Sequence, residues 1–231
     1  MKILEFDNAK EALREMTEEL VKLMAGKEIF NLALSGGTTA KRMFRFWVTE
    51  YDQTIDWELV RFYWVDERCV EPYEEDSNFC YARRLLFDPL TISPTQVFRI
   101  KGENNPQEEA IRYAHIVATH LPTINGTPHF DAIILGIGTD GHTASLFPGD
   151  EAAIDSQSLY ITSEHPVNHQ KRVSMTPRLI LNDSPLLVPM LGKDKLDIIS
   201  MLHTTNKADS NFPAAFVLGR AKNATIYYSA D

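Results

Sequence analysis

Short, strongly apolar runs alternate with longer amphipathic patterns along this chain, and that alternation constrains the fold more than any other feature. Residues 29–34, 60–65 and 130–135 have the length and composition of buried strands. Helical patterns lie before and between them, as at residues 9–23, where apolar side chains recur with the 3.6 period before Gly26. The sequence therefore predicts an α/β fold with a mostly parallel sheet and helices on both faces.

The remaining elements follow from the same patterns. Further strands are expected at 97–100, 159–162, 185–191, 214–218 and 224–228, and further helices at 40–49, 77–87, 103–121, 176–181 and 193–202. Pro189 is awkward inside one of these strands, because proline removes a hydrogen-bond donor from the sheet. The segment 165–170 is expected to be a polar loop.

Length and composition limit the classes of protein that this chain can be. A chain of 231 residues predicts one domain, 1–231, without need of a second. The formal net charge of -9 excludes a nonspecific nucleic-acid binder, although a local cluster of Arg and Lys can still hold an anionic substrate. We expect a monomer or weak homodimer.

Targeting signals and cysteine usage favour the cytoplasm. No apolar run approaches the roughly 18 residues of a membrane span, and the first residues do not resemble a signal peptide. Cys69 and Cys80 fit no common zinc or redox spacing, so reduced thiols are expected.

A glycine turn, Ser35-Gly36-Gly37-Thr38-Thr39, follows the predicted strand 29–34. Glycines bring backbone N–H groups close to an anion, and the N-terminus of the following helix adds partial positive charge. No Gly-Lys-Ser/Thr follows, so this is not a Walker loop. An ordinary strand-to-helix turn is an equally good interpretation of these residues alone.

Charged residues follow the next strand. Asp66-Glu67-Arg68 ends the run 60–65, and arginine is suited to bidentate recognition of phosphate. In isolation such a triplet is more often a solvated charge cluster. The basic pairs Lys171-Arg172 and Lys193/Lys195 are likewise more often surface charge.

A glycine-dense run, GIGTDGHTASLFPG (136–149), follows the strand 130–135 and allows three interpretations. It matches the dinucleotide pattern G-x-G-x-x-G, but Pro148 and Gly149 leave too little room for the crossover helix. It can be a structural turn. It can also be a catalytic loop with His142 as general base and Asp140 beside it, since histidine suits proton transfer near pH 7. Spacing alone leaves the last two open.

Metal binding finds little support in the sequence. The histidines are scattered, and His165 and His169 lie beside Pro166 in an expected loop rather than on a helix. We expect no metal.

Four blocks in order resemble the 6-phosphogluconolactonase family within the glucosamine-6-phosphate isomerase/6-phosphogluconolactonase superfamily. They are LALSGGTTA (32–40), WVDERCVEPYEEDSN (64–78), LGIGTDGHTASLFPG (135–149) and KRVSMTP (171–177), with weaker support from GKDK (192–195) and FPAAFV (212–217). The resemblance implies a modified Rossmann-like three-layer α/β/α fold. It also implies hydrolysis of 6-phospho-D-glucono-1,5-lactone to 6-phospho-D-gluconate, a step of the oxidative pentose phosphate pathway, without a cofactor.

The resemblance also implies a set of site residues. His142 and Asp140 would be catalytic. Substrate and phosphate would be bound by Ser35, Gly36, Gly37, Thr38, Asp66, Arg68, Arg172 and Lys195. Backbone N–H groups of a glycine turn would stabilise the oxyanion.

Three alternatives stay open. A deaminase or isomerase acting on glucosamine 6-phosphate shares the glycine loop and the Asp-Gly-His element, but typically continues with Asn-Glu-Pro, where this chain has Leu146-Phe147-Pro148-Gly149. A non-catalytic sugar-phosphate sensor on the same fold is the second alternative. An NAD enzyme, suggested by the glycine pattern, is the third.

Overall fold

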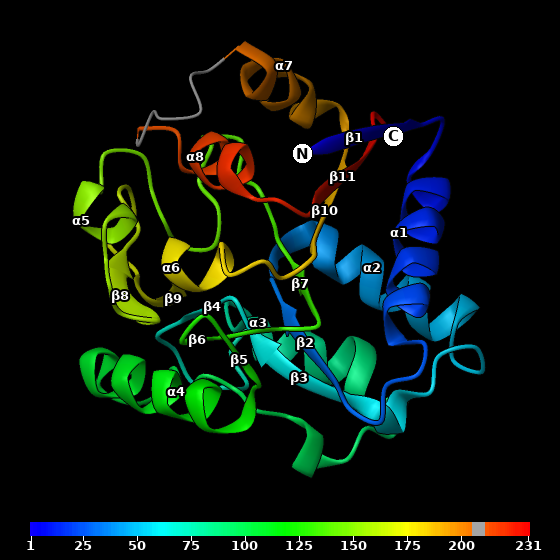
Figure 1. Ribbon diagram of the computed structural model, residues 1–231, viewed down its shortest axis with the longest axis horizontal. Coiled ribbons are helices and arrows are strands. Elements are labelled where there is room, and N and C mark those ends of the chain that lie inside the picture. Colours follow the sequence, from blue (N-terminus) through cyan, green and yellow to red (C-terminus); the bar gives the residue numbers. More distant parts are fainter. Residues whose placement is uncertain (205–210) are drawn as a thin grey trace.

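A parallel six-stranded sheet forms the centre of the molecule (Figure 1). The computed structural model describes residues 1–204 and 211–231, without the side chains of residues 203 and 204. The strand order of the six-stranded sheet is β1-β11-β10-β7-β2-β3, and every pairing in this sheet is parallel. The strands are β1 (Lys2–Phe6), β2 (Phe30–Leu34), β3 (Val60–Trp64), β7 (Ala132–Ile134), β10 (Leu186–Leu191) and β11 (Ala224–Ser229).

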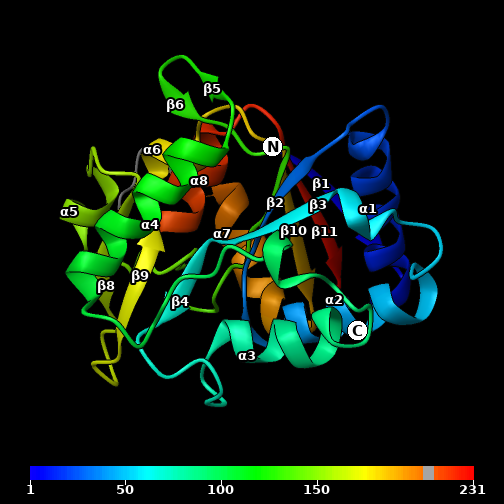
Figure 2. The same cartoon turned by 90° about the horizontal axis from the view of Figure 1, so that it is seen from below.

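Helices cover both faces of this sheet, which confirms the predicted α/β architecture (Figure 2). The helices are α1 (Ala9–Met24), α2 (Gly37–Glu50), α3 (Asn78–Ala82), α4 (Pro106–His120), α5 (Glu151–Ile154), α6 (Pro177–Ile180), α7 (Leu196–Thr204) and α8 (Pro213–Arg220). Short 3₁₀ turns lie at η1 (Trp57–Leu59), η3 (Pro94–Gln96) and η4 (Lys193–Lys195), and a π-helical turn, η2 (Arg83–Phe87), extends α3. Residues 205–210 separate α7 from the segment that leads into α8.

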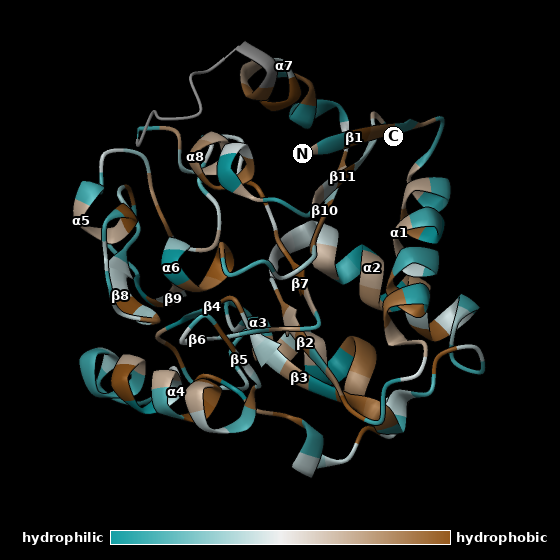
Figure 3. Cartoon of the chain, viewed as in Figure 1, coloured by the Kyte–Doolittle hydropathy of each residue, from teal (hydrophilic) through white to brown (hydrophobic). Residues whose placement is uncertain are grey.

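The helix α1 shows why these segments fold as predicted. Asn8 caps it by accepting a hydrogen bond from the backbone N–H of Glu11 at 3.0 Å. Leu13, Met16 and Leu20 lie on one face and are buried against the sheet. Figure 3 shows the corresponding alternation of hydrophobic and hydrophilic bands along the helices.

Pro189 lies in β10, a strand with neighbours on both sides, and the register explains how it is accommodated. The carbonyls of Pro185 and Leu187 accept hydrogen bonds from the N–H groups of Ile133 and Leu135, respectively. The backbone N–H and C=O groups of the odd-numbered residues of β10 therefore point toward β7. β7 pairs only as far as Leu187, so the missing N–H of Pro189 faces a position that β7 no longer occupies.

A second sheet of three antiparallel strands corrects the prediction around residues 66–68 and adds a strand at 171–175, whereas residues 165–170 form the loop that was predicted. Its order is β4 (Asp66–Arg68), β9 (Lys171–Met175) and β8 (Tyr160–Glu164). The charged triplet Asp66-Glu67-Arg68 is therefore a strand rather than a strand end, and Lys171–Met175 is a strand that we did not predict. Its pattern was hidden because it buries a charged residue, Arg172, on which no apolar alternation can be read.

The predicted strand 214–218 is wrong, because this segment is the helix α8. A short apolar run does not distinguish a strand from a buried helix by periodicity, and Pro213 at the first helical position favours the helix. The predicted strand 97–100 is reduced to a bridge between Phe62 and Val97. β1 and the small hairpin of β5 (Thr123–Ile124) and β6 (Thr127–Pro128) were not predicted.

Among the helices of residues 1–204 and 211–231, none combines the length and apolarity needed to cross a membrane.

Candidate active site

The sheet order places a crevice at the carboxyl ends of β2 and β7. The chain leaves β2 for β3 on one side, whereas it leaves β7 for β10 on the other side. Such a reversal opens a crevice in which open α/β sheets bind ligands. Ser35 follows β2 and Gly136 lies two residues after β7, and the Ser35 hydroxyl accepts a hydrogen bond from the Gly136 N–H at 3.1 Å.

A cleft of about 230 Å³ lies at this point. Every residue that was expected to bind substrate lines it: Ser35, Gly36, Gly37, Thr38, Asp66, Arg68, Arg172 and Lys195. His142 lines it too, together with Thr39, Asn78, Gly136, Ile137, Gly138, Ala144 and Pro189. The structure thus brings together segments that lie up to 160 residues apart in the chain (35 to 195).

The loop after β7 holds a histidine–carboxylate pair at the cleft. Nδ1 of His142 lies 2.5 Å from Oδ1 of Asp140, and the hydrogen bond from His142 lowers the pKa of Asp140 to about 2. Asp140 is therefore ionised at neutral pH and accepts a hydrogen bond from Nδ1–H of His142. Because Nδ1 carries the proton of this hydrogen bond, the lone pair of Nε2 is available to accept another proton. The His142 side chain is 28% exposed, and an accessible nitrogen lone pair is what a general base requires.

Gly138 permits this pair to form. A Cβ atom on Gly138 would lie 2.2 Å from the His142 ring and 2.6 Å from Oδ1 of Asp140. The Gly138 N–H donates to the His142 carbonyl at 2.9 Å, so the loop turns back on itself. Bridges between Ile137 and Thr143 and between Thr143 and Leu146 continue the turn, and the next helix, α5, has four residues. The glycine run therefore does not lead into the crossover helix of a dinucleotide-binding motif.

The N-terminus of α2 opens onto the same cleft. The first N–H groups of a helix have no intrahelical partner, so those of Gly37, Thr38 and Thr39 are donors for an anion. By contrast, the N–H groups of Gly136, Gly138 and Gly141 already donate to other groups of the protein. The start of α2 is therefore a further source of amide donors at this cleft, beside the turn after β7, where the oxyanion donors were expected.

Asn78 is a lining residue that we did not single out from the sequence. Its Nδ2 donates to the Asp66 carbonyl at 2.9 Å, and a Cβ on Gly36 would lie 1.8 Å from its Oδ1. Glycine is therefore required at position 36 by this close approach. The helix predicted at 77–87 was the available signal, because it places Asn78 at the start of a helix, next to the N-cap Ser77.

Three cationic side chains reach the cleft from three different elements. Arg68 comes from β4, Arg172 from β9 and Lys195 from η4. Nζ of Lys195 donates to the Ile137 carbonyl at 3.0 Å, and a terminal nitrogen of Arg68 donates to the Asp76 carbonyl at 2.5 Å. Two carboxylates lie near these three cations: Asp194 is 3.5 Å from Nζ of Lys195, and Asp66 is 3.9 Å from a guanidinium nitrogen of Arg172. The set keeps an excess of positive charge, which favours an anionic ligand.

Asp66 is buried, and its carboxylate already interacts with other side chains of the protein. Its Oδ2 accepts from the Ser145 hydroxyl at 2.7 Å and lies 3.9 Å from a guanidinium nitrogen of Arg172. Burial lowers the pKa of Arg172, and the Asp66 carboxylate opposes that effect. A carboxylate repels phosphate, so this geometry favours Asp66 as the residue that holds Arg172 in place.

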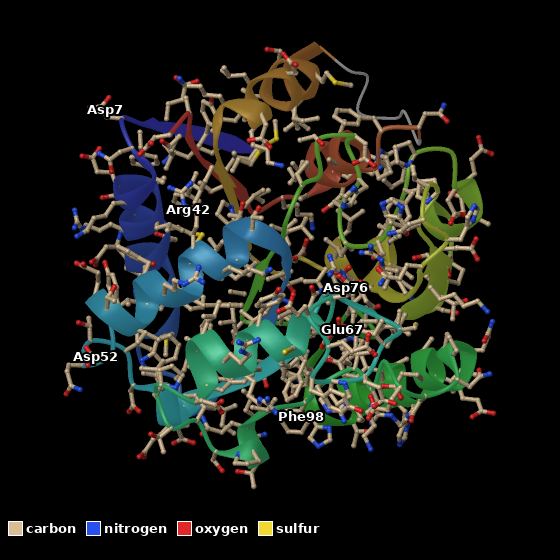
Figure 4. All side chains as sticks on the ribbon, turned by 180° about the vertical axis from the view of Figure 1, so that it is seen from behind. Asp7, Arg42, Asp52, Glu67, Asp76 and Phe98 are labelled. Carbon is tan, nitrogen blue, oxygen red and sulfur yellow. The ribbon has the colours of Figure 1, made fainter. Side chains whose placement is uncertain are left out.

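Glu67, which is labelled in Figure 4, was part of the predicted triplet and makes hydrogen bonds of its own within the protein. Its carboxylate accepts from the N–H groups of Arg68, Asn78 and Phe79 and from the Ser77 hydroxyl, at 2.7–3.0 Å. It thereby ties β4 to the start of α3. Burial raises its pKa to about 7, against the opposing effect of the backbone hydrogen bonds.

No metal cluster accompanies these groups: the described parts of the chain contain no set of three His, Cys, Asp or Glu residues that could hold an ion.

Fold and cleft together define an α/β protein with a crevice at a topological switch point, lined by three cationic side chains and by a histidine that is paired with a carboxylate. The family model described as glucosamine-6-phosphate isomerases/6-phosphogluconolactonase matches residues 5–227. The chain belongs to this family.

Relatives of the family are similar over most of their length. A 6-phosphogluconolactonase of Treponema pallidum (strain Nichols) is 38% identical over 195 residues, which cover 84% of this chain and 81% of the relative. A 6-phosphogluconolactonase of Haemophilus influenzae is 34% identical over 232 residues, covering 100% and 97%.

Solved structures agree with the fold. The crystal structure of a devB protein superimposes with a TM-score of 0.91 at 35% identity, covering 99% of this chain and 95% of that one. A monomeric glucosamine-6-phosphate deaminase has a TM-score of 0.83 at 20% identity, covering 99% and 97%, and at that identity the likeness concerns the fold alone.

Proposed function

We propose that this chain hydrolyses 6-phospho-D-glucono-1,5-lactone to 6-phospho-D-gluconate, as a 6-phosphogluconolactonase of the oxidative pentose phosphate pathway. One observation carries the proposal: a histidine with a free Nε2 and three cationic side chains line the same cleft. The lactone carries an anion at one end and an electrophilic carbonyl at the other. The relatives named 6-phosphogluconolactonase support the same activity.

Phosphate binding would orient the reacting end of the substrate. Arg68, Arg172 and Lys195 surround the anion, and the N–H groups at the start of α2 supply further donors to negative charge on the ligand. Binding energy from this remote group restricts the lactone to orientations in which C1 faces His142.

His142 then moves one proton in each half of the reaction. Nε2 accepts a proton from water while the water oxygen bonds to C1, which gives a tetrahedral oxyanion. The oxyanion collapses, the bond from C1 to the ring oxygen breaks, and Nε2 returns the proton to that oxygen as it becomes a hydroxyl. Asp140 stabilises the imidazolium between the two steps. The product carboxylic acid loses its proton to solvent, and no covalent intermediate or cofactor is needed.

The test is a coupled assay of freshly prepared lactone, with the spontaneous rate subtracted. Enzymatic opening by the wild-type chain, lost at least 100-fold in His142→Ala, is the expected result, since general base catalysis typically contributes 10²–10⁴-fold. Wild-type kcat/KM in His142→Ala contradicts the histidine mechanism. Absence of any catalysed opening contradicts the activity itself.

A deaminase remains the second candidate because its fold is shared. Ammonia release from glucosamine 6-phosphate would identify it. The segment after His142 argues against it, because Thr143 to Gly149 contains no acid, and Thr143 and Ser145 are fully buried in structural hydrogen bonds. Tight binding of 6-phosphogluconate without turnover would instead identify a sensor.

We further propose a single domain, 1–231, that is a monomer or weak homodimer in the cytoplasm and does not bind nucleic acid. The free thiols of Cys69 and Cys80 support a reducing compartment, and the net charge of -9 supports the exclusion of nucleic acid. Sedimentation at several concentrations measures the oligomeric state.

A further inference from the structure

The residue between the two members of the proton-transfer pair is held by the segment that leads into α8. Gly141 separates Asp140 from His142 and has a φ of +85°. A Cβ on Gly141 would lie 1.9 Å from Cε2 and 2.1 Å from Cδ2 of Phe212, so the Phe212 ring occupies the space beside Gly141 that a side chain would need. Phe212 is 4% exposed and belongs to the hydrophobic core.

A backbone hydrogen bond fixes the same residue from the same side. The N–H of Ala214, in the first turn of α8, donates to the Gly141 carbonyl at 3.0 Å. The Gly141 N–H donates in turn to the Gly138 carbonyl at 3.1 Å. Gly141 is thus fixed at its Cα, its carbonyl and its amide.

The pair itself lies at the surface. The side chains of Asp140 and His142 are 45% and 28% exposed, and an exposed ion pair alone holds its partners weakly, because ordering the side chains costs entropy. Their separation of 2.5 Å therefore depends on the backbone that joins them.

We propose that Phe212 is a positioning residue for the proposed lactonase reaction, which keeps Asp140 and His142 in register by packing on Gly141. It touches neither the cleft nor the reacting atoms, and it acts through the backbone of the loop. The proposal rests on the proposed function for its kinetic consequence, but its geometric consequence does not need that function.

Other charged groups near His142 are unchanged by a substitution at Phe212. The Phe147 ring lies 5.1 Å from the His142 ring. The same Phe147 ring lies 5.9 Å from the Arg172 guanidinium and 5.1 Å from the His165 ring. Lys195 contacts the carbonyl of Ile137 in the same loop. Only the distance to Asp140 is expected to change.

The test compares Phe212→Leu and Phe212→Ala with Phe216→Leu, a matched change on the partly exposed face of α8 where Phe216 stacks on Arg220 at 3.7 Å. For Phe212→Leu we expect kcat to fall about 10-fold, because small misplacements of catalytic groups have large kinetic costs. KM should change less than 2-fold, since the cations lie on other elements. The acid limb of the kcat/KM profile should move to lower pH as the Asp140 carboxylate loosens from the imidazolium.

A double-mutant cycle with Gly141→Ala isolates the contact. In the wild-type background Gly141→Ala has two costs: alanine disfavours the positive φ, and its Cβ clashes with the Phe212 ring. In the Phe212→Ala background only the cost of the positive φ remains. We therefore expect Gly141→Ala to lower kcat by a smaller factor in the Phe212→Ala background than in the wild-type background. Equal losses in both backgrounds, or a Phe212→Leu enzyme with unchanged kcat and acid limb, overturn the proposal.

An NMR titration of the His142 ring nitrogens keeps the two proposals separate. A shift of its midpoint in Phe212→Leu, absent in Phe216→Leu, supports positioning even if the wild-type chain does not open the lactone. An unshifted midpoint refutes positioning even if the lactonase activity is established.

Discussion

Replacing Asp140 with asparagine tests the contribution of the carboxylate to proton transfer. Asparagine keeps an oxygen at the position of Oδ1, so it can still accept the Nδ1 proton of His142 at the 2.5 Å contact, but it carries no charge. The substitution therefore removes the electrostatic part of the interaction and leaves the shape of the loop in place.

The magnitude follows from the pKa of Asp140, which His142 lowers from 3.8 to about 2. A depression of roughly two units corresponds to about 2.5 kcal/mol at ~1.4 kcal/mol per unit. Because the side chain is 45% exposed, solvent screening reduces this to as little as about 1 kcal/mol. If the imidazolium forms in the rate-limiting step, kcat should fall roughly 5-fold to 60-fold.

The assay is steady-state lactone opening, corrected for spontaneous hydrolysis, with kcat and KM resolved. Glu164→Gln serves as the matched control, because Glu164 and Nδ1 of His169 form a similar pair at 2.7 Å whose side chains are more exposed and do not line the cleft. We expect that control to match the wild type. Asp140→Asn activity within 2-fold of wild type, or a loss confined to KM, would refute the reasoning.

Three further changes address the cleft and its supports. Arg172→Met should raise KM about 10- to 150-fold with a smaller effect on kcat, because a charge-assisted contact to phosphate contributes roughly 1.5–3 kcal/mol; weaker competitive inhibition by inorganic phosphate checks the same contact, and unchanged KM contradicts it. Gly36→Ala should lower Tm by roughly 2–12 °C, since overpacking costs about 1–3 kcal/mol in a chain of this size. The same substitution should lower Tm by less in an Asn78→Ala background, relative to Asn78→Ala alone, because the clashing Oδ1 is gone. For Glu67 the folded pKa, about 7, is above the unfolded value of 4.5, so the folded state binds its proton more tightly. The stability of the wild type relative to Glu67→Gln should therefore decline by up to about 3 kcal/mol as pH rises from 4.5 to 7, and level off above 7; urea titrations at several pH values measure it, and a flat difference contradicts it.

Much of the framework could be predicted because buried parallel strands leave a strong signal. The runs that became β2, β3 and β7 are almost continuously apolar, since both faces of such strands are covered. Their carboxyl ends then indicate where ligands bind, so Ser35 and His142 could be placed at one edge of the sheet before any coordinates were known.

Features that depend on register or tertiary context could not be predicted. Pro189 fits its strand only because β7 ends early, and that is a property of two strands together. The strand β9 hides Arg172 in a buried position that no pattern of polar and apolar residues encodes. Asn78 and Phe212 lie against the glycines at 36 and 141, which are distant in the sequence.

The edge strand β1 has a consequence for synthesis. β1 pairs with β11 and occupies the end of the sheet, although 217 residues separate Phe6 from Ala224. At roughly 5–20 residues per second, a ribosome needs on the order of 10–45 s to deliver the partner of a strand that emerged first. During that interval the apolar face of α1 lacks β11 and β10, against which it packs in the finished protein. The apolar face of α1 therefore stays uncovered until β10 and β11 have been synthesised, and the sheet closes only when β11 arrives.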